Sequence, residues 1–192
     1  MGHHRAGAGV KITVPTSDEA DDATAGTVGI VHIELEEARV LVSLADQLQA
    51  LLAEAIESPL DDDSAVRRLL PDAYPHEPEL ADEWRRLSRR GLVDRKIGFA
   101  RTLSRALAPV VADGVARSVP LTADAALDWV RGIGDVRLVI ADRLGIIVDG
   151  DDGSFGEPGL RDVYDWLAWL QDGIVQLLEA AEPRRATPGA AS

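Results

Sequence analysis

The residue types best suited to molecular recognition lie together in one stretch of the sequence. Between residues 85 and 105 there are eight basic side chains and a single acid, Asp94, so this stretch carries +7 and the rest of the chain −20. On a helix, positions 85, 89 and 96 recur on one side, with 86 and 90 beside them. Such a stripe could contact phosphates or an acidic protein surface. The alternative is a solvated helix face whose guanidinium groups pair with the protein's own acids. The candidate binding residues are Arg85, Arg86, Arg89, Arg90, Arg95, Lys96, Arg101 and Arg105.

Tryptophan side chains form a second candidate surface near the end of the chain. Trp166 and Trp169 lie about 300° apart around a helix at 100° per residue, so they flank one broad face. We interpret them as part of the hydrophobic core or its rim. The alternative is that they anchor a partner or a second copy of the chain, because tryptophan is enriched at interfaces.

No motif in the sequence predicts catalysis or metal binding. His32 and His76 lack the spacing of HExxH or of a zinc fingerprint. The acidic run from Asp149 fails as a calcium loop, because Ser154 and Leu160 stand where the pattern requires glycine and glutamate. The chain has no cysteine, which excludes disulfides, thiolate metal sites and cysteine nucleophiles. We therefore assign no catalytic residue, metal ligand or cofactor.

Size and charge narrow the class of protein. The 192 residues are enough for one domain of ordinary size, and 46% hydrophobic with 28% charged residues is typical of a globular protein. A net charge of −13 opposes nonspecific binding to nucleic acids or anionic membranes. No run approaches a membrane span, and the first residues lack the apolar core of a signal peptide. We expect a cytoplasmic protein.

Hydrophobic periodicity predicts a short hairpin followed by helices. Residues 10–15 and 28–35 alternate as strands, with Val31 and Ile33 on one face and His32 on the other, and residues 16–27 are a flexible acidic loop. The helices are expected at 36–58, 64–70, 79–107, 122–144 and 160–181. Ser88 to Gly91 could split the third helix in two. Residues 113–120 and 149–159 are predicted to be loops.

These elements predict a mainly α fold. No alternation of strands and helices could build a parallel sheet. We expect a single α-helical domain over residues 10–182, with about five or six helices and a short N-terminal β-hairpin. Residues 1–9 and 183–192 are tails. The predicted core contains Leu48, Leu52, Trp129, Ile140, Leu167 and Leu170.

Four segments together resemble a known family. They are RRLLPDAY (67–74), RKIGFARTLSRAL (95–107), DVRLVIADRLGI (135–146) and VYDWLAWLQDGIVQLL (163–178). Their order and content resemble the actinobacterial DUF2017 family over most of residues 28–181. The resemblance implies a cytoplasmic protein, usually encoded beside the adaptor of the Clp protease. It carries over no enzymatic activity, cofactor or catalytic residue. Some members are described as transcription regulators that respond to oxidative stress, and a thiol-based form of that role cannot apply to a chain without cysteine.

Three functions from different classes remain open at this point. The first is a non-catalytic regulatory protein that acts through protein–protein contacts on the transcription or Clp proteolysis machinery, with a homodimer among the assemblies it allows. The second is a DNA-binding transcription regulator that uses the basic 85–105 helix, in which case a two-fold dimer is expected. The third is an enzyme whose site is assembled from distant residues. None of the three requires a membrane partner.

Overall fold

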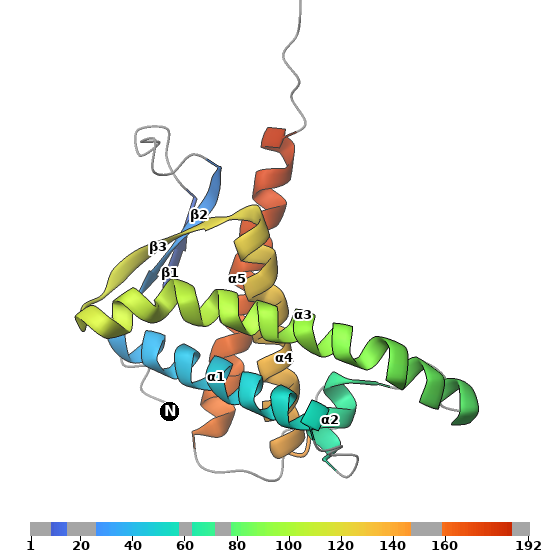
Figure 1. Cartoon of the computed structure of the whole chain (residues 1–192). Coiled ribbons are helices and arrows are strands. Elements are labelled where there is room, and N and C mark those ends of the chain that lie inside the picture. Colours follow the sequence, from blue (N-terminus) through green and yellow to red (C-terminus); the bar gives the residue numbers. More distant parts are fainter. Residues whose placement is uncertain (1–8, 15–25, 58–62, 72–77, 147–158, 186–192) are drawn as a thin grey trace, which may run out of the picture.

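The computed structural model describes residues 9–14, 26–57, 63–71, 78–146 and 159–185, and for residues 78–87 and 182–185 it describes the backbone only. In these ranges the chain is mainly α-helical, as predicted, with a small antiparallel sheet at one end (Figure 1). The elements in order are β1 (Lys11–Thr13), β2 (Thr27–Ile33), α1 (Leu35–Glu57), α2 (Ser64–Leu69), α3 (Pro78–Asp113), β3 (Arg117–Thr122), α4 (Ala123–Arg143) and α5 (Leu160–Arg185). The predicted tail 1–9, apart from Gly9, and most of the predicted loops 16–27 and 149–159 lie outside the described residues, as do residues 186–192.

The sheet has one strand more than the sequence predicts. β1 and β2 form the expected antiparallel hairpin, and β3 pairs with the other edge of β2, which gives the order β1-β2-β3. The prediction of a loop over residues 113–120 was therefore wrong at its C-terminal end. Only Val119 and Leu121 are buried in β3, too short an alternation to indicate a strand. Pro120 is tolerated because β3 is an edge strand, where one N–H need not join the ladder.

One face of the sheet packs on α5. Val31 and Ile33 are buried and His32 is half-buried, as the alternation predicts. At Gly29 the side chain of Leu177 comes so close that an added Cβ would lie 1.7 Å from the Leu177 Cδ1 atom. The glycine thus lets α5 approach the backbone of β2 directly.

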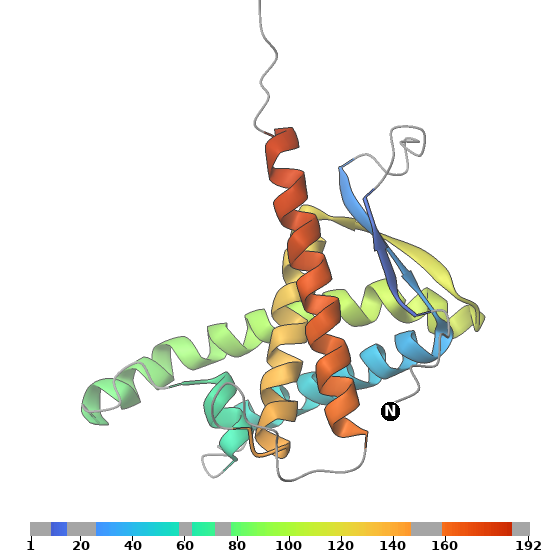
Figure 2. The same ribbon diagram turned by 180° about the vertical axis from the view of Figure 1, so that it is seen from behind.

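The helices form two crossing pairs. α1 and α3 lie along each other, α4 and α5 lie along each other, and α3 crosses α4 (Figures 1 and 2). In both views the N-terminal end of α3 projects beyond α4 and α5. None of the described helices carries an apolar stretch long enough to cross a membrane.

α3 is one continuous helix of 36 residues, so of the two alternatives left open by Ser88 to Gly91 the structure has the unbroken helix. Gly91 is exposed, and an added Cβ there would meet only the end of the Arg95 side chain at 4.0 Å. A glycine in an exposed helix interior costs about 1 kcal/mol. The contacts that α3 makes with α1 and α4 outweigh this penalty.

The helix ends carry residues of the types that commonly cap helices. Asp63 caps α2 by accepting bonds from the backbone N–H groups of Ala65 (2.8 Å) and Val66 (3.2 Å). Thr122 caps α4, and Gly145 follows that helix with φ +70°, the left-handed conformation that glycine adopts without strain. All six residues predicted for the core are buried: Leu48, Leu52, Trp129, Ile140, Leu167 and Leu170.

Candidate functional site

The eight basic residues singled out in the sequence all lie on α3. Arg90, Arg101 and Arg105 are exposed on one side of the helix, because eleven residues make close to three turns and four make close to one. Arg95 is exposed on the flank of the same surface. None of these four makes a hydrogen bond or ion pair with another described residue. We call Arg90, Arg95, Arg101 and Arg105 the α3 arginine face. The structure describes only the backbone of Arg85 and Arg86.

Arg89 and Lys96 differ from the other basic residues because they turn toward the protein. Arg89 is half-buried and has interaction partners. The Nζ atom of Lys96 donates a hydrogen bond of 2.5 Å to Oδ1 of Asp135 on α4. The side chains of Lys96 and Asp135 are only 15% and 8% exposed. Lys96 is therefore part of the α3–α4 contact, and its charge is paired with Asp135 and is not offered to a partner molecule.

Asp135 lies in an environment that disfavours its charge. Burial raises the pKa of its carboxyl above the ordinary value, although the hydrogen bond and charge of Lys96 act to lower it. Its second oxygen, Oδ2, is buried and has no hydrogen-bond partner among the described residues. The helices approach closely here, since a Cβ on Gly132 would lie 3.3 Å from the Phe99 carbonyl group. The Lys96–Asp135 pair therefore holds α3 against α4 at a point where the two helices are close.

The two tryptophans differ in accessibility. Trp169 is 52% exposed, and it lines a groove of about 330 Å³ between β1 and α5 together with Val14 and Gly173. Trp166 is half-buried and lines a shallow hollow beside Val40. Leu167 and Leu170 between and beside them are fully buried. The tryptophans therefore flank the buried face of α5, as their spacing predicts.

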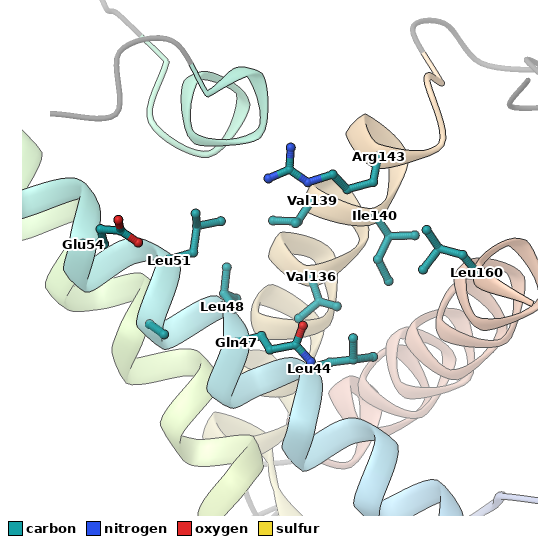
Figure 3. Close-up of a pocket in the computed structure, with 11 residues that line it drawn as sticks. Leu44, Gln47, Leu48, Leu51, Glu54, Val136, Val139, Ile140, Arg143 and Leu160 are labelled. Carbon is teal, nitrogen blue, oxygen red and sulfur yellow. The ribbon is translucent and has the colours of Figure 1, made fainter. Parts of the chain in front are cut away.

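A larger pocket, which the sequence did not indicate, lies between α1 and α4 (Figure 3). Its volume is about 430 Å³. We call it the α1–α4 pocket. In Figure 3 the apolar side chains of the two helices face each other across it, with Leu160 at one end and Glu54 at the other. Its apolar lining consists of Leu44, Leu48, Ala50 and Leu51 from α1, Val136, Val139 and Ile140 from α4, and Leu160 from α5.

Two charged side chains, Glu54 and Arg143, line this pocket. Arg143 donates a hydrogen bond of 3.0 Å from Nη2 to Oδ2 of Asp63, the capping residue of α2. Burial raises the pKa of Asp63, but the bond and charge of Arg143 and the N–H groups of Val66 and Ala65 lower it, and the net direction is downward. Glu54 has no hydrogen-bond or ion-pair partner in the described part of the chain.

His32 makes side-chain contacts that the sequence could not predict. Its Nδ1 lies 2.7 Å from the Ser118 hydroxyl oxygen on β3, and its Nε2 lies 3.1 Å from the Thr13 hydroxyl oxygen on β1. The contact with Ser118 depends on β3, which was predicted as loop. Among the described residues no carboxylate bonds to His32, so these groups do not form a Ser–His–Asp triad. They link the three strands on the outer face of the sheet.

The comparison with known families decides where this chain belongs. A family model described as a domain of unknown function, DUF2017, matches residues 18–178. The chain belongs to the DUF2017 family. No curated protein and no solved structure matches it.

The DUF2017 region contains most of the candidate surfaces. The α3 arginine face, both tryptophans and the α1–α4 pocket lie within residues 18–178, whereas β1 precedes this region. In the described ranges of this DUF2017 protein, no three His, Asp or Glu side chains come together in a group that could hold a metal ion.

Proposed function

We propose that this DUF2017 protein is a non-catalytic regulatory protein of the cytoplasm that acts by binding an acidic surface of another protein through the α3 arginine face. The observation that supports this proposal is the exposure of four arginines without partners in the described residues, in a chain whose net charge is −13. Within the described residues, pairing with the protein's own acids does not account for these four. Unpaired charges on one surface raise the rate and selectivity of association with a complementary surface.

A protein partner fits this surface better than DNA does. A DNA duplex carries about one negative charge per 1.7 Å of its axis, so the −13 chain as a whole would be repelled along it. Asp94 also lies on the exposed side of α3. A partner protein can present a local acidic patch and leave the rest of its surface neutral. The family resemblance suggests the transcription or Clp proteolysis machinery as the source of that partner.

The test reverses the charge of the surface. The variant carries Arg90→Glu, Arg101→Glu and Arg105→Glu. The parent and the variant are each used to capture proteins from a lysate of the source organism. The captured proteins are identified, and the partner is then purified. The matched control carries Arg39→Glu, Arg67→Glu and Arg117→Glu, three exposed arginines on other elements, and has the same net charge. We expect the control to keep the partner and the α3 variant to lose it. Both variants are expected to stay folded, because exposed ion pairs contribute about 0–1 kcal/mol.

The purified pair distinguishes the alternatives. Binding of an acidic protein should weaken as salt rises and retain a salt-resistant part, because only exposed charges are screened. If the partner is duplex DNA, the affinity should fall steeply with salt, with a slope set by the number of phosphates contacted. A folded α3 variant that retains every partner of the parent would refute the proposal.

A further inference from the structure

We propose that the α1–α4 pocket binds a small hydrophobic ligand with a cationic end, such as an amine on a hydrocarbon chain. The inference is independent of the proposed function, because the pocket and the α3 arginine face share no residue. It rests on the volume and lining of the pocket and on the state of the two charged side chains that line it, Glu54 and Arg143 (Figure 3).

The hydrocarbon part of the ligand follows from the lining. Eight of the eleven lining residues are apolar, and they face the pocket from α1, α4 and the first residue of α5. The volume of about 430 Å³ lies in the range of about 300–1,000 Å³ that is usual for small-molecule sites. Two of the lining residues, Leu48 and Ile140, are buried in the core. The walls are therefore fixed by the fold before a ligand arrives.

The cationic end follows from which charges are already paired. Arg143 bonds to Asp63, and Asp142 bonds to Arg68 at 3.3 Å. Each of these pairs is electrically neutral. Of the charged side chains that line the pocket, only the carboxylate of Glu54 has no partner among the described residues. An ammonium group beside Glu54 would gain an opposite charge.

A carboxylate ligand fits this pocket poorly, because Arg143, the only cationic side chain among the described lining residues, is already paired. To reach Arg143 it would have to compete with Asp63, whose Oδ2 accepts the Nη2 hydrogen bond. It would also lie beside the carboxylates of Asp63 and Asp142, the second of which is 3.9 Å from Nη1 of Arg143. Like charges at such distances disfavour binding. The sign of the head group is thus the property that the pocket selects.

The first experiment measures this selection on the full chain. Binding of n-octylamine, n-octanol and n-octanoate, all below their aggregation limits, is measured by calorimetry and by NMR titration. We expect n-octylamine to bind about two- to fivefold more tightly than n-octanol, the range expected for a solvent-exposed ion pair, and n-octanoate to bind most weakly. Glu54→Gln should reduce the affinity for n-octylamine to that for n-octanol and leave n-octanol unchanged. The control Glu57→Gln removes an exposed acid of α1 that does not line the pocket, and it should change neither affinity.

The second experiment places the ligand in the pocket. Ala50 is exposed and lines the pocket, and Ala53 is exposed on the same helix without lining it. Ala50→Trp fills the pocket and should abolish binding of all three compounds, whereas Ala53→Trp should preserve it. Thermal unfolding confirms that both variants are folded. The proposal is overturned if n-octylamine binds no more tightly than n-octanoate, if none of the three compounds binds the parent chain, or if binding persists in folded Ala50→Trp. Loss of the protein partner in the arginine variants would leave these results unchanged, so the two proposals fail separately.

Discussion

The Nζ atom of Lys96 lies 2.5 Å from Oδ1 of Asp135, in a contact between α3 and α4 that is largely closed to solvent. Two opposite charges are removed from water here, and each is tolerated only because the other is present. The pair therefore makes the stability of the fold depend on one basic residue of α3, whereas Arg90, Arg95, Arg101 and Arg105 of the same helix are exposed.

Removing Lys96 should destabilise the protein strongly. Lys96→Met leaves the Asp135 carboxylate buried without a counter-charge, a change that typically costs about 3–5 kcal/mol at neutral pH. The double variant Lys96→Met, Asp135→Leu should recover much of this loss, because no charge is then left behind. Urea unfolding of the two variants measures the difference. Equal stability of Lys96→Met and the parent would show that the pair is not needed for the fold.

Asp135 should give the stability of the protein a specific dependence on pH. Its pKa is raised above the ordinary value of 3.8 in the folded state, so the folded chain binds the proton more tightly than the unfolded chain. The free energy of unfolding contributed by this group must then fall as the pH rises from 3.8 through the raised pKa. Asp135→Asn removes this contribution. The difference in unfolding free energy between parent and variant, measured over a pH series, should decrease across that window, and a difference that increases would contradict the raised pKa.

Two glycines on neighbouring helices should respond in opposite directions to alanine. Gly132 faces the backbone of Phe99, and an added Cβ would lie 3.3 Å from its carbonyl carbon and oxygen, so α3 and α4 would have to separate. Gly98 on α3 has nothing within 4 Å of the same position. Gly98→Ala should therefore raise the free energy of unfolding by up to about 1 kcal/mol through helix propensity, while Gly132→Ala should lower it. Thermal unfolding of the two single variants tests the contrast.

The buried face of α5 should be sensitive to truncation where it meets the core. Leu170 is fully buried, so Leu170→Ala is expected to cost about 2–5 kcal/mol. Leu138→Ala on α4 is the control, because that side chain is exposed. A melting temperature of Leu170→Ala that matches the parent would mean that the packing at this position is loose.

Local chemistry in the sequence predicted the helices and the core, and it also determines the helix caps. Asp63, Thr122 and Gly145 act within a few residues of themselves, so their roles could be assigned without knowing the fold. The apolar stripes likewise placed Leu48, Trp129 and Leu170 in the interior. The inward turn of Lys96 also left a signal, because its position three and four residues from Val93 and Ala100 places it on the buried side of α3.

Other features were decided only when distant segments came together. β3 exists because the free edge of β2 offers hydrogen bonds to Arg117–Thr122, whose own pattern is too short to indicate a strand. The α1–α4 pocket depends on how closely two helices approach, which is set by side chains far apart in the chain. The partner of Lys96 is a further example, because Asp135 lies 39 residues away in the chain and nothing local links the two. Whether a basic side chain is paired or free depends on which helix packs against it, and that is a property of the tertiary structure alone.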